Sequence, residues 1–198
     1  MPDAAGYQAL IFDCDGTLAD NHPAHYAALN EVLQRYGVRI SWDWYTARTG
    51  LPGAETLAEA AEEHSLSFPV PVSDLAAECE TAYLRHLHLV REASWVADIA
   101  RGNSGRPTAV ASSGRRASVE ATLGAIDLES SFHAVVTRED VQEVKPAPDL
   151  FLLAARRLGA EPTQCLVFED SDEGCLAAQR AGMTVTDVRQ VASNQRPG

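Results

Sequence analysis

Residues 10–18 read LIFDCDGTL, an apolar run that ends in two aspartates one residue apart. The run predicts a buried strand, and Gly16 predicts a turn directly after it. This strand would carry Asp13 and Asp15 together to its carboxyl end. Two carboxylates so close repel each other unless a cation neutralises them or one of them keeps a proton. Mg²⁺ takes oxygen ligands and a protonated carboxyl can act as a general acid, so both solutions are useful chemistry.

The same D-x-D-G pattern also begins calcium loops and ordinary turns. An EF-hand needs further acidic ligands at fixed spacing and a glutamate that closes the loop. Residues 17–22 do not supply them.

Four further β-type runs follow the first one, with helical segments between them, at residues 108–111, 134–137, 166–168 and 184–188. Pro148 and Gly159 mark the beginning and the end of one of these helices. Alternating strands and helices predict an α/β fold with a Rossmann-like parallel sheet and right-handed crossovers.

One interval breaks this alternation. Residues 20–87 show amphipathic helices and no convincing strand, so we expect an α/β core of residues 1–19 and 88–198 with a helical cap inserted at 20–87. Ligands of open α/β sheets bind at the carboxyl ends of the strands. An insert directly after the first strand is therefore a candidate lid over the site.

A second acidic pair, Glu169 and Asp170, ends the apolar run at 165–168. If both strands are central and parallel, the two pairs converge at one edge of the sheet. Such a concentration of carboxylates requires a hard divalent cation. The alternative is that acidic residues after a strand only form a soluble turn.

Lys145 is the only lysine among sixteen Lys and Arg residues. A compact ammonium suits a tight site where it must contact both a phosphoryl oxygen and a carboxylate. The alternative is a solvated lysine before a helix that starts at a proline. Ser112, Ser113 and Gly114 follow the second strand and could form an anion cradle at a strand-to-helix turn, although this tripeptide is also a common turn.

The net charge of -12 and the pI of about 4.8 argue against a protein that binds the phosphate backbone of nucleic acid. No apolar stretch approaches the length of a membrane span and no signal peptide is evident. Four cysteines without metal-type spacing fit free thiols, so we expect a cytoplasmic protein. The expected partner is a small phosphorylated metabolite, with no nucleic acid and no membrane, and the expected state is a monomer or weak dimer.

In order along the chain, these pieces resemble the four motifs of the haloacid dehalogenase superfamily: D-x-D-G-T, a strand-end serine, a lysine and a terminal acidic pair. The stretches 145–149 and 169–183 are similar to its β-phosphoglucomutase-like branch. Within that branch, residues 162–189 look most like bacterial fructose-1-phosphate phosphatases.

The resemblance implies a phosphoric monoester hydrolase. Asp13 would be the nucleophile that forms an aspartyl phosphate, and Asp15 would be the general acid and base. Ser112 and Lys145 would bind the transferring phosphoryl group. The implied cofactor is Mg²⁺, held by the side chains of Asp13, Glu169 and Asp170 and by the backbone carbonyl of Asp15.

For the substrate-binding residues, the resemblance points to His25, to Thr49 and Gly50 in the cap, and to Ser113 and Arg115 in the core. His25 could equally be a packed side chain. Pro52, Gly53 and Gly114 stand where the mutases of this branch present polar or basic groups. These departures favour transfer of the phosphoryl group to water over a mutase reaction.

The sequence thus predicts a Mg²⁺-dependent phosphatase that hydrolyses a small sugar phosphate resembling fructose 1-phosphate. Two alternatives are a phosphomutase of the β-phosphoglucomutase type and a non-catalytic protein that binds a metabolite on the same fold.

Overall fold

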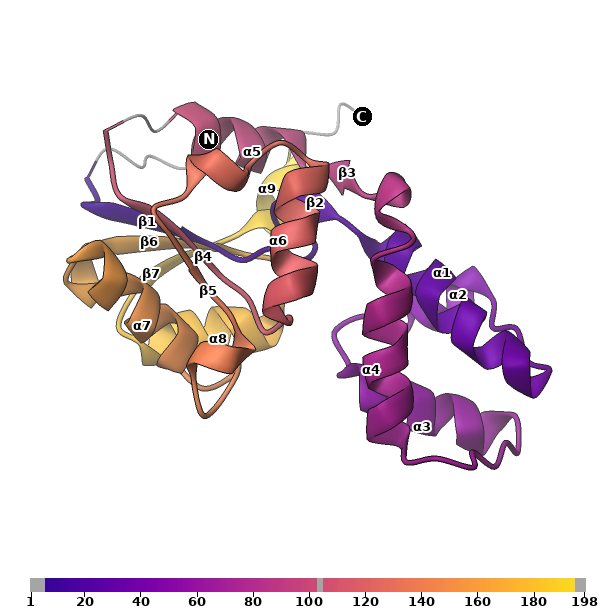
Figure 1. Ribbon diagram of the computed structural model, residues 1–198. Helices are drawn as coiled ribbons and strands as arrows, with labels where there is room; N and C mark the ends of the chain where they lie inside the picture. The colour runs from indigo at the N-terminus through magenta and orange to yellow at the C-terminus, as the bar shows by residue number, and fades with distance from the viewer. Residues whose placement is uncertain (1–5, 103–104, 195–198) are drawn as a thin grey trace. The chain divides into compact units, whose positions relative to one another are not determined.

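The computed structural model describes residues 6–102 and 105–194, which divide into two compact units (Figure 1). The first unit holds the described residues of Met1–Asp20 and Arg91–Gly198, and the second is Asn21–Val90. The expected insert was 20–87. The boundary lies at residue 90 because the two-residue strands β2 (Ala19–Asp20) and β3 (Arg91–Glu92) pair with each other and belong to the first unit.

The first unit contains a five-stranded sheet in the order β5-β4-β1-β6-β7, and every pairing in it is parallel. Its strands are β1 (Ala9–Phe12), β4 (Thr108–Ala111), β5 (Ala134–Val136), β6 (Cys165–Glu169) and β7 (Thr184–Asp187). The predicted α/β fold with a Rossmann-like parallel sheet is confirmed. β1, the strand of the opening motif, is the central strand.

Two predicted strands end one residue early. β5 stops before Thr137 because this residue caps a 3-10 turn, η4 (Arg138–Asp140). β7 stops at Asp187, whose carboxylate accepts a hydrogen bond from the backbone N–H of Arg189 at 3.0 Å, and helix α9 (Val188–Asn194) begins there.

Helices cover both faces of the sheet (Figure 1). α5 (Ser94–Gly102) and α6 (Arg116–Ala125) lie on one face, and α7 (Asp149–Leu158) and α8 (Asp172–Arg180) lie on the other. Because side chains alternate along a strand, neighbouring positions serve different layers. Ile11 packs in the cluster with α7 and α8, whereas Phe12 stacks on Phe168 with ring centroids 4.9 Å apart.

The second unit, Asn21–Val90, is described in full and consists of helices joined by turns and loops, with no strand. Its elements are α1 (His22–Leu33), η1 (Gln34–Tyr36), α2 (Trp42–Thr46), α3 (Gly53–Glu63), α4 (Val72–Tyr83) and η2 (Leu87–Leu89). α4 packs against both α1 and α3, and Leu33, Leu57 and Leu75 are completely buried. The role of this unit as a lid stays a prediction.

Short 3-10 turns complete the first unit: η3 (Glu129–Ser131) before β5 and η5 (Pro162–Gln164) before β6. Among the described residues, no helix has the length and apolarity that a membrane crossing requires. All four cysteines are free thiols. The cytoplasmic location stays a prediction.

Candidate active site

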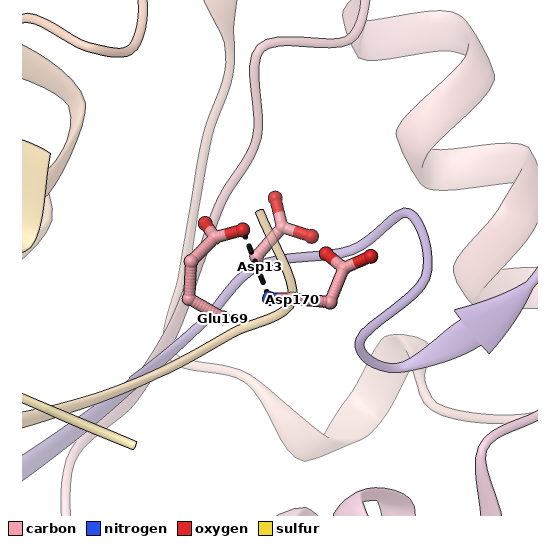
Figure 2. A group of neighbouring side chains, drawn as sticks. All are labelled: Asp13, Glu169 and Asp170. Carbon is pink, nitrogen blue, oxygen red and sulfur yellow. Dashed lines mark hydrogen bonds between the residues drawn. The ribbon is translucent and has the colours of Figure 1, made fainter. Parts of the chain in front are cut away.

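The two acidic pairs meet because their strands are neighbours. β1 and β6 pair in parallel with Phe12 opposite Phe168, and the backbone N–H of Asp13 donates to the carbonyl of Phe168 at 3.0 Å. The chain continues from the two strands at the same edge of the sheet. One carboxylate oxygen from each of Asp13, Glu169 and Asp170 lies within 4.8 Å of the others (Figure 2).

Lys145 joins this group from the loop before α7. Its Nζ donates to Oδ1 of Asp13 at 2.5 Å and to Oε2 of Glu169 at 2.7 Å. The lysine side chain is 6% exposed and that of Glu169 is 1% exposed, so water scarcely screens these contacts. The only lysine of the sequence therefore lies in the cluster of carboxylates around Asp13.

The charges at the site are unbalanced. Burial, and after it the charge of Glu169, raises the pKa of Asp13 well above its ordinary value. Burial and Glu169 likewise raise the pKa of Asp170 to about 7. Burial alone would lower the pKa of Lys145, but the carboxylates of Asp13 and Glu169 outweigh this effect and raise it. Three carboxylates against one ammonium favour a further cation, and oxygen donors of this kind fit a hard divalent ion.

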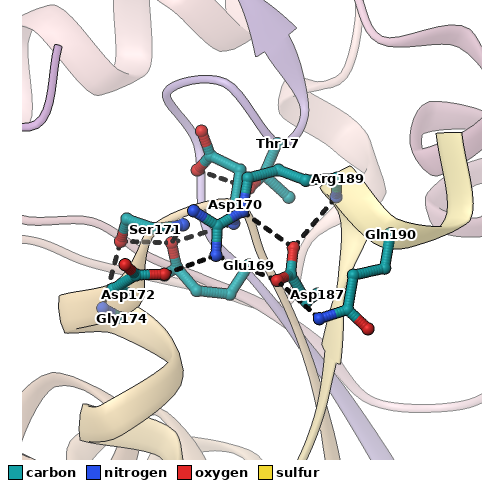
Figure 3. A network of polar contacts seen from close by, with 9 residues as sticks. All are labelled: Thr17, Glu169, Asp170, Ser171, Asp172, Gly174, Asp187, Arg189 and Gln190. Atoms are coloured by element: carbon teal, nitrogen blue, oxygen red, sulfur yellow. Dashed lines mark hydrogen bonds and ion pairs between the residues drawn. The ribbon is translucent and has the colours of Figure 1, made fainter. Parts of the chain in front are cut away.

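Glu169 and Asp170 are held by a network of polar contacts (Figure 3). Oε1 of Glu169 accepts hydrogen bonds from the backbone N–H groups of Asp170 and Ser171, both at 3.0 Å, and from the hydroxyl of Ser171 at 2.8 Å. The same hydroxyl accepts from the N–H of Gly174 and caps α8. Oδ1 of Asp170 accepts from Oγ1 of Thr17 at 3.1 Å.

Two glycines make room for these carboxylates. A Cβ atom on Gly16 would stand 2.1 Å from Oδ2 of Asp170, and the φ of +83° at this position also disfavours any side chain. A Cβ atom on Gly174 would stand 2.0 Å from Cδ of Glu169. Both distances are too short for non-bonded atoms, so glycine is required sterically at each position.

Ser112 approaches from β4, on the other side of β1. Its hydroxyl donates to Oδ2 of Asp15 at 3.4 Å and accepts from the N–H of Gly114 at 3.0 Å. The hydroxyl of Ser113 is buried and has no hydrogen-bond partner in the described part of the chain. The structure thus brings Ser112 to Asp15, next to the cluster of Asp13, Lys145, Glu169 and Asp170.

The other predicted substrate-binding residues are not part of this cluster. Arg115 is exposed at the N-cap of α6. His25, Thr49 and Gly50 belong to the helical unit, where the ring of His25 stacks on that of Tyr83 with centroids 4.2 Å apart. Packing on Tyr83 accounts for the position of His25. The binding roles of all four residues stay predictions.

Sequence reasoning did not single out Thr17 or Ser171 as residues that hold the site. The only available signal was a hydroxyl residue next to each acidic pair. The partner of Thr17 comes from tertiary structure, because Thr17 and Asp170 are 153 positions apart, whereas Ser171 donates to Glu169 two positions before it.

The sequence pattern of the haloacid dehalogenase-like hydrolases matches residues 10–188, which is most of the chain and includes every residue of this cluster. The chain belongs to this family. The predicted resemblance to haloacid dehalogenase hydrolases is confirmed.

Two relatives in this family are similar over almost the entire chain. Fructose-1-phosphate phosphatase YqaB of Escherichia coli is 39% identical over 92% of this chain and 97% of its own length. A phosphorylated carbohydrates phosphatase of Thermotoga maritima is 32% identical, over 89% of this chain and 82% of its own length.

A solved member of similar fold is CbbY of Rhodobacter sphaeroides in complex with phosphate. It has a TM-score of 0.77 and 29% identity, over 90% of this chain and 84% of that one. With phosphatases among its relatives along nearly its full length, this haloacid dehalogenase-like hydrolase is a phosphoric monoester hydrolase.

Proposed function

We propose that the protein is a Mg²⁺-dependent phosphatase that hydrolyses a small sugar phosphate resembling fructose 1-phosphate, through an aspartyl phosphate on Asp13. The observation that carries this proposal is the buried contact of Lys145 with Asp13 and Glu169, next to Asp170. The substrate is inferred from the similarity to the E. coli enzyme.

The side chains of Asp13, Glu169 and Asp170 and the backbone carbonyl of Asp15 would hold the Mg²⁺ ion. The raised pKa values of Asp13 and Asp170 support a cation here, because burial and, after it, the charge of Glu169 make both ionised carboxylates unfavourable without one. Bound Mg²⁺ would offset the repulsion between the anionic nucleophile and a phosphate dianion.

Asp13 would attack phosphorus, and Lys145 would serve two purposes at once. Its ammonium donates to Oδ1 of Asp13 and would also stabilise charge on the phosphoryl group that is transferred to this carboxylate. Glu169 fixes the ammonium from the far side through Oε2. Ser112 would donate its hydroxyl to a phosphoryl oxygen.

Asp15 would protonate the leaving oxygen and then take a proton from the hydrolytic water. In the free protein Oδ2 of Asp15 accepts a hydrogen bond from Ser112, so this carboxyl lies beside the hydroxyl that would bind the phosphoryl group. A serine hydroxyl has one proton, so it would turn from Asp15 to the phosphoryl oxygen when the substrate binds and would free the Asp15 carboxyl for proton transfer.

Substrate selection would fall to residues around this cluster. The buried hydroxyl of Ser113 is available for a polar group of the ligand, and we propose that Arg115 adds a positive charge nearby. His25, Thr49 and Gly50 would contribute from the helical unit if this unit acts as a lid.

A panel of phosphorylated metabolites that includes fructose 1-phosphate tests the proposal, with phosphate release measured in Mg²⁺ and in EDTA. We expect release that depends on Mg²⁺ and is greatest with sugar monophosphates. Isomerised sugar phosphate in place of inorganic phosphate would indicate the mutase. Ligand binding without any turnover would indicate a non-catalytic protein.

A further inference from the structure

Asp140 is a largely buried carboxylate that lies outside the catalytic cluster and has partners on three elements. Its side chain is 16% exposed. Oδ2 accepts from the backbone N–H of Thr137 at 2.9 Å, from the Thr137 hydroxyl at 3.2 Å and from Nη2 of Arg116 in α6 at 2.5 Å. Oδ1 accepts from Nη2 of Arg157 in α7 at 2.8 Å.

These contacts fasten two loops to each other. The turn after β4 runs from Ser112 to Arg116, and the loop after β5 runs from Thr137 to Lys145. Besides the ion pair of Asp140 with Arg116, the N–H of Arg138 donates to the carbonyl of Gly114 at 3.3 Å. The N–H of Arg116 donates to Oε2 of Glu139 at 3.1 Å.

The first loop carries Ser112 and the second carries Lys145, the two groups assigned above to the phosphoryl group. We propose that Asp140 is a positioning residue that sets the spacing between Ser112 and Lys145. This inference rests on the proposed function and deepens it, because it names the residue that holds the two phosphate-binding loops in place.

The acidic half has a different support. The hydroxyls of Ser171 and Thr17 donate to Glu169 and Asp170, whereas Asp140 bonds to Thr137, Arg116 and Arg157. Lys145 contacts both halves, because it also donates to Asp13 and Glu169. A change at Asp140 should therefore weaken the binding of phosphate more than the binding of Mg²⁺. A general loosening of the fold would weaken both equally.

The test is the dissociation constant of inorganic phosphate, measured by calorimetry on the full chain with saturating Mg²⁺, in the wild type and in Asp140→Asn. We expect Asp140→Asn to weaken phosphate binding about tenfold, because the neutral amide cannot hold both arginines and small displacements of binding groups are costly. The Mg²⁺ dissociation constant, measured without phosphate, should change much less than the phosphate constant. The KM of the preferred substrate should rise together with the dissociation constant of phosphate.

Glu120→Gln is the matched control, because it removes another carboxylate partner of the same Arg116, on the exposed face of α6 at 3.3 Å. It should leave both constants unchanged. If Asp140→Asn does not fold, Arg116→Gln serves in its place, since it removes the ion pair between the loops and spares the bonds of Asp140 to Thr137 and Arg157.

The inference would be overturned if the dissociation constant of phosphate changed no more in Asp140→Asn than in Glu120→Gln. A loss of Mg²⁺ binding as large as the loss of phosphate binding would do the same, because it would mark a merely structural residue. Failure of the wild type to bind phosphate at all would instead count against the proposed function.

Discussion

Two clusters of ion pairs, one in each unit, use similar residue types in opposite surroundings. Lys145 contacts Asp13 and Glu169 with side chains that are 6%, 8% and 1% exposed. In the helical unit, Arg48 contacts Glu59 and Glu63 with side chains that are 24%, 46% and 49% exposed. In the first cluster burial strongly raises the pKa of Asp13, whereas water screens the charges of the second.

The difference between the clusters is one of burial: one lies in the candidate active site and the other joins two helices at the surface. A buried cluster with surplus negative charge is costly unless cations enter it, so we expect it to respond to metal ions and protons. The exposed cluster joins α2 to α3 and gains further contact where Arg48 lies over the ring of Trp44, 3.9 Å from its centroid. Mutations in the two clusters should therefore differ in kind as well as in size.

The largest effect is expected at the nucleophile. Asp13→Asn should lower kcat at least about 10⁴-fold, because the amide cannot form the phosphoryl-enzyme and the remaining groups do not replace it. Phosphate release with the preferred sugar phosphate measures this effect. The variant should keep its circular dichroism spectrum, and full activity in it would reject covalent catalysis.

A matched pair of substitutions compares the two clusters directly. Lys145→Met should lower the unfolding free energy by about 3–5 kcal/mol, since it leaves buried carboxylates without their cation. Arg48→Met should cost about 0–1 kcal/mol, as is typical of an exposed pair. Urea unfolding in EDTA near neutral pH measures both, and equal losses would refute the contrast between the clusters.

The pH dependence of stability is the next test. The pKa of Asp170 is raised to about 7 in the folded protein. Because this lies above the unfolded value of about 3.9, the folded chain keeps a proton that the unfolded chain releases, and the metal-free protein should lose stability from about pH 4 to about pH 7.

Mg²⁺ should reverse this trend, because metal ligands must be deprotonated. We expect Mg²⁺ to raise Tm by several degrees more at about pH 8 than at about pH 5.5. Thermal melts with Mg²⁺ and with EDTA at both values measure the difference. A Mg²⁺ shift that is the same at both pH values would contradict the assignment of Asp170 to the metal.

The smallest effects should come from two helical glycines, and they should have opposite signs. Gly174→Ala should destabilise the protein by about 1–3 kcal/mol, because its Cβ atom would overlap with Glu169. Gly53→Ala should stabilise it by about 0.5–1 kcal/mol, because the nearest atom is 4.0 Å away and alanine favours a helix. Loss of stability in both variants would show that the steric argument at Gly174 is not specific.

Much of the core could be predicted from the sequence, because a buried parallel strand is a short apolar run and its carboxyl end follows from the chain direction. The strands and their direction were enough to predict that the acidic pairs Asp13/Asp15 and Glu169/Asp170 lie at the same edge of the sheet. The two-residue strands β2 and β3 were missed, since such short elements have no periodicity.

The fine arrangement of the site could not be predicted in the same way. Nothing local to Asp140 shows that arginines from α6 and α7 meet on it, because this depends on how two helices pack. The same holds for Thr17, whose partner Asp170 is supplied by tertiary structure.

The position of β1 in the middle of the sheet has a consequence for biosynthesis. A ribosome releases Asp13 and Asp15 early, but β4 begins only at Thr108 and β6 only at Cys165. Since synthesis proceeds from the N-terminus, the nascent chain carries these two aspartates without their neighbours until both later strands have been made. We expect reactivity toward phosphorylated metabolites to arise only once β6 has left the exit tunnel.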